Sequence, residues 1–334
     1  MRRRSGWSRS LGSLFCSGRE GAGMPSHPIR GGDRIFRAAA MAAATIALFL
    51  VLGIAYTLLE GSYPSVGRFG LGFILGTEWD PAIKMAFGAL PLIWGTLVTS
   101  AIALLLGVPV SLGVGLLLSE FAPRRSRFPL SLLVELLAAV PSVVYGLWGI
   151  FILAPTLRDF VYPALQAALG FLPSFSGSYS GLGVLTAGII LAIMIVPTVS
   201  AVSREVFSAV PNSQREAFFA IGATRWEVAR HVFSYARSGV IGAVTLGLGR
   251  ALGETMAVTM VIGNRFEIPS SLFQPGYTMA ALIASEFNEA TDPLYVSSIV
   301  EVGLLLFAIT LSVSIVARLL VRRSMKLFRE VGNE

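Results

Sequence analysis

The sequence predicts an all-α integral membrane protein with six transmembrane helices and both termini in the cytoplasm. Hydrophobic residues make up 54% of the 334 residues and charged residues only 13%, about half the charged share of an ordinary soluble domain. Six apolar segments each provide the roughly 20 helical residues that cross a bilayer. The arginines and lysines gather in short segments at one side of these spans, as topology signals do.

The predicted spans, in chain order, are residues 38–59, 90–118, 130–153, 182–202, 239–263 and 296–320. The second span is long enough to demand a tilt or a break. Pro109, Pro141 and Pro197 lie inside the second, third and fourth spans and are candidate kinks, because proline removes a helix hydrogen bond.

The distribution of positive charge sets the predicted orientation. Basic residues precede the first span, follow the second and fourth spans, and follow the last, whereas the other side carries only Arg68, Lys84, Arg158 and Arg265. Cytoplasmic loops hold the excess of Lys and Arg, so both termini and the loop 204–238 are predicted to be cytoplasmic. The net charge of +7 therefore reflects membrane topology and does not indicate nucleic-acid binding.

The chain divides into four predicted parts. Residues 1–34 are rich in Arg, Ser and Gly and read as a disordered basic cytoplasmic tail, with Met24 as an alternative start and a targeting peptide as the competing interpretation. Residues 35–89 hold the first span and an external loop, 90–321 the membrane core with its loop 204–238, and 322–334 a cytoplasmic tail. Cys16 is the one cysteine and the two histidines, His27 and His231, are far apart, so no internal disulfide and no metal site is expected.

The cytoplasmic loop 212–235 carries two helix-start signals. Ser213-x-x-Glu216 and Thr224-x-x-Glu227 both fit the capping box, in which hydroxyl and carboxyl groups satisfy the free N–H groups of a first turn. Gly222 suits the left-handed backbone that ends a helix. The first helix would carry a small apolar patch, made of Ala217, Phe218, Ala220 and Ile221. A short helix outside the membrane needs a partner for such a patch; the alternative is a helix lying on lipid headgroups.

The fifth predicted span contains a charged pair. Arg250 and Glu254 are four residues apart, so a continuous helix places them on one face. An arginine at mid-bilayer costs about 2.5–3.5 kcal/mol on insertion scales and is expected to face a partner or water. The planar N–H donors of its guanidinium group match the spacing of two phosphate oxygens. Two interpretations stay open: Arg250 lines a pore, or it forms a closed structural pair with Glu254.

Other polar residues within the spans leave further alternatives. Glu135 and Glu301 are each a candidate partner for Arg250, although Glu301, near the external end of its span, is expected to reach water. Thr255 and Thr259 either add hydroxyls to a pore or bond helix carbonyls. Glu254 suggests a filter, because hydrogen phosphate offers a proton to a carboxylate and sulfate offers none.

Two motifs resemble a known family. Glu216-Ala217, followed by Gly222, resembles the EAA loop of ABC-importer permeases, although the usual Leu-Pro is replaced near Phe233 by Phe-Ser-Tyr. The segment 247–264, GLGRALGETMAVTMVIGN, is similar to the fifth span of the PstC-type permeases of bacterial phosphate-specific ABC importers. The resemblance implies type I importer architecture, with the 212–235 loop as the coupling helix that docks on a cytoplasmic ATPase. The ATPase-coupling residues that it implies are Ser213, Glu216, Ala217, Phe218, Ile221, Gly222, Thr224 and Glu227.

The resemblance further implies a multi-pass permease of the bacterial inner membrane that imports inorganic phosphate along Arg250, Glu254 and Thr255. Its implied partners are a PstA-like permease, two ATPase subunits and an external phosphate-binding protein. The chain itself has no GxxxxGK[ST] loop, so it is not expected to be an enzyme or to hold a cofactor, and ATP with magnesium belongs to the partner ATPase. The alternatives are a permease for sulfate or molybdate, an ion-coupled carrier or channel, and a membrane scaffold.

Overall fold

The computed structural model describes residues 31–331, and these residues are mainly helical. The chain divides into two compact units, at residues 1–54 and 55–334. In the first unit the described part is the beginning of helix α1, which runs from Gly31 to Phe69. Helix α1 thus begins before the end of the predicted tail 1–34, while residues 1–30, including Met24 as an alternative start, lie outside the described residues.

The second unit holds the remaining elements. The helices are α2 (Leu71–Leu75), α3 (Leu90–Leu116), α4 (Arg124–Ala138), α5 (Ser142–Trp148), α6 (Ala154–Thr156), α7 (Tyr162–Leu169), α8 (Val184–Ser208), α9 (Asn212–Ala220), α10 (Arg225–Gly253), α11 (Met256–Val261), α12 (Met279–Glu286) and α13 (Pro293–Val331). Helical turns of other kinds are η1 (Leu117–Phe121), η2 (Gly149–Leu153), η3 (Leu157–Val161) and η4 (Pro173–Phe175). A departure from the all-α prediction is a short antiparallel pair of strands, β1 (Trp79–Asp80) and β2 (Ala86–Phe87).

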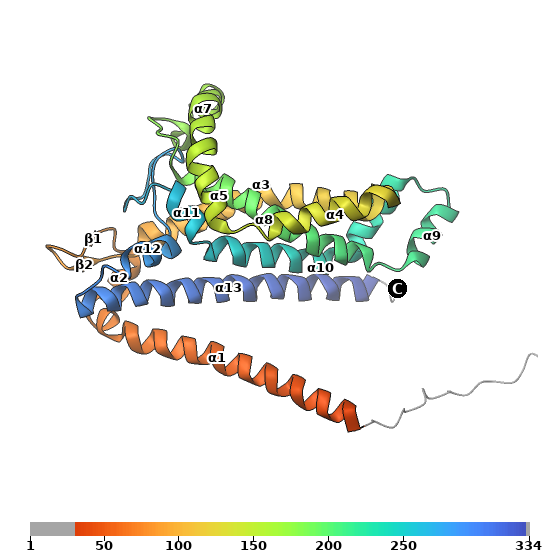
Figure 1. Cartoon of the computed structure of the whole chain (residues 1–334), viewed down its shortest axis with the longest axis horizontal. Helices are drawn as coiled ribbons and strands as arrows, with labels where there is room; N and C mark the ends of the chain where they lie inside the picture. The colour runs from red at the N-terminus through yellow and green to blue at the C-terminus, as the bar shows by residue number, and fades with distance from the viewer. Residues whose placement is uncertain (1–30, 332–334) are drawn as a thin grey trace, which may run out of the picture. The chain divides into compact units, whose positions relative to one another are not determined.

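Helix α8 is the centre of the bundle. It packs along α3 and also contacts α10 and α4, and these helices run alongside one another in Figure 1. Small residues on α3 allow the close approach: a side chain on Gly107 would overlap Ile195, and one on Gly115 would touch Ser203. The same helix face carries small residues at every fourth position, namely Gly95, Thr99, Ala103, Gly107, Ser111 and Gly115, all buried. Such stripes give membrane helices their van der Waals contact, because lipid removes the hydrophobic drive for helix association.

Aromatic residues pack together where β1, β2, α12 and the start of α13 meet. Trp79 of β1 packs edge-on against Phe87 of β2, and Phe87 stacks on Tyr295 of α13. Glu286, at the end of α12, accepts hydrogen bonds of 2.7 Å from both Trp79 Nε1 and Tyr295 Oη. The segment that carries β1 and β2 is therefore held against α12 and α13 through a shared carboxylate.

Two predicted spans are interrupted. The segment 130–153 is divided between α4 and α5, with Pro141 preceding α5. The segment 239–263 is divided between α10 and α11, because Glu254 adopts an extended backbone (φ −69°, ψ 124°). By contrast, α3 continues through Pro109 and α8 through Pro197.

Five helices in the described part of the chain are long and apolar enough to cross a membrane, by length and composition. They cover Ile35–Phe69, Leu90–Phe121, Ser142–Leu169, Val184–Ser208 and Pro293–Leu319. The prediction of 239–263 as one continuous helix was wrong, since α10 ends at Gly253. Two glycines near that point, Gly249 and Gly253, weaken the helix, and the Glu254 carboxylate accepts from an N–H of the next helix.

The contact between α3 and the chain before α12 gives a test of the packing. A methyl group at Gly95 would lie 1.9 Å from the carbonyl oxygen of Tyr277. We expect Gly95→Ala to destabilise the purified protein by about 1–3 kcal/mol, since overpacking must shift backbone, and to lower its thermal midpoint in detergent. Gly113→Ala on the same helix is the control, because nothing lies within 4 Å of its added carbon. An unchanged midpoint for Gly95→Ala would contradict the packing described.

Candidate functional site

The junction between α10 and α11 shapes the site. Helix α10 ends at Gly253, and Glu254 Oε1 accepts a hydrogen bond of 3.4 Å from the backbone N–H of Ala257, in the first turn of α11. Glu254 thus serves a helix start, as carboxylates commonly do. Glu254 is the C-cap residue of α10. Its carboxylate bonds the start of α11 and forms no ion pair with Arg250 in the described part of the chain, so the closed structural pair is not formed.

Arg250 borders a cavity of about 610 Å³ between three helices. Its lining comes from α8, α10 and α13 and comprises Thr198, Gly242, Thr245, Leu246, Gly249, Arg250, Ser314 and Arg318. The Nε atom of Arg250 is buried and has no hydrogen-bond partner among the described residues. None of the lining residues is a carboxylate. The Thr245 hydroxyl donates to the carbonyl of Ile241 at 2.7 Å. The cavity therefore offers two guanidinium groups and the hydroxyls of Thr198 and Ser314 as donors suited to an anion.

The structure adds lining residues that sequence reasoning had missed. Arg318 is one of the basic residues after the last predicted span, which were used only to predict the membrane orientation. A basic residue at the end of an apolar span also indicates a candidate for the lining of a polar cavity. Thr198 and Ser314 gave no signal, because a hydroxyl in a membrane helix usually bonds its own backbone. Their place in the cavity depends on how α8 and α13 pack around α10.

Glu254 and Thr255 are not among the residues that line the Arg250 cavity. The Thr255 hydroxyl donates to the carbonyl of Gly253 (3.2 Å), and the Thr259 hydroxyl donates to the carbonyl of Thr255 (2.7 Å). Both hydroxyls therefore satisfy carbonyls at the helix break, which is one of the two alternatives left open by the sequence.

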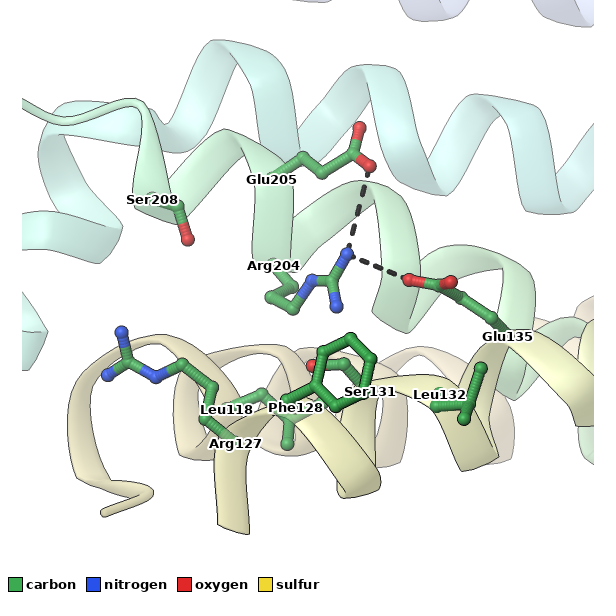
Figure 2. A pocket seen from close by; sticks show the side chains of 9 residues that line it. All are labelled: Leu118, Arg127, Phe128, Ser131, Leu132, Glu135, Arg204, Glu205 and Ser208. Carbon is green, nitrogen blue, oxygen red and sulfur yellow. Dashed lines mark hydrogen bonds and ion pairs between the residues drawn. The ribbon is translucent and has the colours of Figure 1, made fainter. Parts of the chain in front are cut away.

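The two candidate acidic partners of Arg250 lie elsewhere. Figure 2 shows Arg204 of α8 between two carboxylates, at 3.1 Å from Glu135 Oε1 and 3.8 Å from Glu205 Oε1. These residues line a second pocket, of about 520 Å³. Glu301 is only 4% exposed, so the expectation that it reaches water was wrong. It is buried in the same region as Ser65 of α1, whose hydroxyl lies 3.1 Å from that of Ser298 on α13.

The loop 212–235 has the predicted helix–turn–helix form. Thr224 caps α10 through a complete capping box, with the Thr224 N–H donating to Glu227 Oε2 at 2.7 Å and the Glu227 N–H donating to Thr224 Oγ1 at 3.4 Å. Hydrogen bonds from the Thr224 backbone and hydroxyl hold the pKa of Glu227 below its ordinary value. Gly222 has the expected left-handed backbone (φ +88°). The prediction that Ser213 caps α9 was wrong: the helix begins at Asn212, and Pro211 occupies the capping position.

The outer surface of α9 is partly apolar. Ala217 and Ala220 are exposed, and Ile221 is 80% exposed. Phe218, predicted to belong to this patch, is turned inward instead and lies 3.9 Å, ring centre to ring centre, from His231 of α10. Phe219 is 48% exposed. An exposed apolar surface on a short helix fits a docking surface for another protein, and Glu216 lies exposed beside it.

These features define a class: a helical membrane protein with a cationic cavity between its helices and a capped helix–turn–helix loop with an exposed apolar surface. The chain belongs to the family described as binding-protein-dependent transport system inner membrane components, whose model matches residues 107–326. This finding confirms the resemblance of the two sequence motifs.

Individual relatives agree. The chain is 45% identical over 296 residues to "Phosphate transport system permease protein PstC" of Mesorhizobium japonicum, covering 87% of this chain and 90% of the relative. It is also 45% identical to the protein of the same name from Haemophilus influenzae, covering 87% and 93%. Among solved structures, it resembles the fold of a chain of a bacterial ABC transporter involved in the import of the acidic polysaccharide alginate, with a TM-score of 0.57, 15% identity, and coverage of 87% of this chain and 96% of that one.

The capping box gives a local test of the loop. Replacing Thr224 with Ala removes the hydroxyl that accepts from Glu227 N, and loss of such a cap costs about 1 kcal/mol. We expect faster hydrogen exchange at the first amides of α10 in Thr224→Ala. Ser213→Ala is the matched control, because Ser213 is not the cap of α9. Equal protection of the α10 amides in wild type and Thr224→Ala would contradict the role of the box.

Proposed function

We propose that this chain is the PstC-type permease subunit of an ATP-driven importer of inorganic phosphate in the bacterial inner membrane. The observation that carries the proposal is the Arg250 cavity, whose lining has two arginines, the hydroxyls of Thr198 and Ser314, and no carboxylate. Its donor set matches a tetrahedral oxyanion. The substrate is phosphate because the similar chains are named phosphate transport permeases.

The proposed topology has six crossings with both termini in the cytoplasm. In this arrangement α4 with α5, and α10 with α11, each form one interrupted crossing. The two interrupted crossings pack together: a side chain on Gly146 of α5 would meet Met260 and Ala257 of α11. Broken helices at membrane depth are tolerated where protein covers them or where they line a cavity. We assign Glu254 and Thr255 to the substrate pathway together with Arg250 because they form the break that follows it, outside the lining of the Arg250 cavity itself.

The proposed partners follow from the loop and the family. Helix α9 and its neighbours, including Ser213, Glu216, Ala217, Phe218, Ile221, Gly222, Thr224 and Glu227, form the coupling loop for a cytoplasmic ATPase. ATP and magnesium are bound by two such ATPase subunits. A PstA-like permease completes the membrane part, and an external binding protein delivers phosphate. Closure of the ATPases moves α9, and the helices around Arg250 then open the cavity to the cytoplasm.

The first test is uptake of radiolabelled phosphate by cells that lack their own high-affinity importer and carry this chain with its partners. Uptake by the wild type should need ATP and survive collapse of the proton gradient. Charge-assisted hydrogen bonds are worth about 1.5–3 kcal/mol, so Arg250→Gln should reduce uptake roughly 10- to 100-fold. Arg318→Gln should have a smaller effect, because Arg318 is exposed.

Arg265→Gln is the control, since Arg265 pairs with Glu267 at an exposed external position. If Arg250→Gln transports as well as wild type, Arg250 has only a structural role. If the cells take up sulfate or molybdate and no phosphate, the architecture stands and the substrate is wrong. Uptake abolished by loss of the proton gradient would instead indicate an ion-coupled carrier.

Glu254 gives a separate test of selectivity. A carboxylate beside the pathway accepts the proton of hydrogen phosphate and repels sulfate. We therefore expect Glu254→Gln to admit sulfate in competition with phosphate, measured as inhibition of phosphate uptake by excess sulfate. Glu267→Gln, an exposed external carboxylate, serves as the control. Intact phosphate uptake with no inhibition by sulfate in Glu254→Gln would exclude the filter.

A further inference from the structure

Arg215 of α9 is held in a dense set of contacts that the transport function has not yet used. Its guanidinium forms a bidentate interaction with the Glu120 carboxylate: Nε donates to Oε2 at 3.2 Å and Nη2 donates to Oε1 at 2.9 Å. The side chains are only 15% and 9% exposed. A two-armed arginine–carboxylate pair fixes orientation as well as distance, and breaking a buried pair is costly because one charge is left behind.

The same guanidinium also closes the cytoplasmic end of α8. Nη2 donates to the carbonyl of Phe207 at 2.8 Å, and Nη1 donates to the carbonyl of Val210. The last carbonyls of a helix lack partners within the helix, and a cation there also complements the helix dipole. Arg215 therefore joins three elements: its own α9, the end of α8, and the π-helical turn η1 that continues α3 and holds Glu120.

Apart from Arg215, helix α9 has few packing contacts with the rest of the helix bundle. It contains no fully buried residue, so its hold on the bundle relies on partly buried side chains, chiefly Arg215 and Phe218. Its opposite surface, with Ala217 and Ile221, is exposed. A displacement of α9 by a docked protein is therefore passed to the bundle largely through the guanidinium.

The elements that receive this displacement reach the substrate cavity. Thr198 lines the Arg250 cavity and lies on α8 nine residues before Phe207, about 14 Å along a rigid helix. We propose that Arg215, with Glu120, is the positioning residue that links α9 mechanically to α8 and α3, so that movement of the coupling loop changes the Arg250 cavity. This inference rests on the proposed function and adds to it the residue pair that carries the coupling.

The test is the number of phosphate ions transported per ATP hydrolysed by the complete importer in proteoliposomes. Arg215→Gln should leave the assembled ATPase within about twofold of wild type and lower the transport ratio about fivefold or more. Arg215→Lys keeps the positive charge but loses the planar pair of N–H donors, so its transport ratio should lie between those of wild type and Arg215→Gln. The double variant Arg215→Gln/Glu120→Gln should have the same transport ratio as Arg215→Gln alone, since each of the two changes removes the same interaction. Arg230→Gln, an exposed arginine of the same loop, is the control.

A wild-type transport ratio in both Arg215→Gln and Glu120→Gln overturns the proposal, even if total activity falls, because the pair then only stabilises the fold. If Arg215→Gln does not assemble, Glu120→Gln decides, since its amide keeps the shape of the side chain. A wild-type importer that hydrolyses ATP but carries another oxyanion would refute phosphate as substrate. The same ratio measured with that oxyanion would still test Arg215.

Discussion

The close contact of α8 with α3 is the constraint on which the other elements depend. In lipid, apolar surface gains little from meeting apolar surface, and helices associate through close packing. The small residues repeated every fourth position on α3 provide that packing, and Gly188 of α8 accepts Ile102 of α3 in return. Because α8 is held in place by α3, the short helices α5 and α11 on either side of the interruptions can pack against it.

The interruptions in turn place polar chemistry inside the bundle. A continuous α10 would satisfy its own carbonyl groups and present a smooth face. The break after Gly253 instead leaves backbone groups that Glu254, Thr255 and Thr259 must satisfy. Unpaired backbone is tolerated at membrane depth only where protein or a water-filled cavity receives it. The location of Arg250, four residues before the break and bordering a cavity, follows this rule.

The sequence predicted features whose causes are local. Hydropathy located four of the five long apolar helices but misplaced the third, which covers Ser142–Leu169 and not 130–153. The Thr224 capping box and the left-handed Gly222 were correct, because both depend on a few consecutive residues. Features set by distant packing could not be predicted. Glu135 pairs with Arg204, 69 residues away, and Arg215 with Glu120, 95 residues away. Spacing alone also did not decide whether Arg250 and Glu254 form an ion pair, because Glu254, the C-cap of α10, bonds the first turn of α11 instead.

Arg204, Arg215 and Arg250 differ in whether a carboxylate of the chain compensates their positive charge. Arg204 and Arg215 each have carboxylate partners within 3.1 Å, so their charges are compensated inside the protein. Arg250 has no ion pair among the described residues, and its Nε is buried without a hydrogen bond. A guanidinium keeps its proton at any relevant pH, and an uncompensated charge away from water is costly. The described side chains do not supply that compensation. In the function proposed above, a phosphate ion in the adjoining cavity would supply it while it passes Arg250.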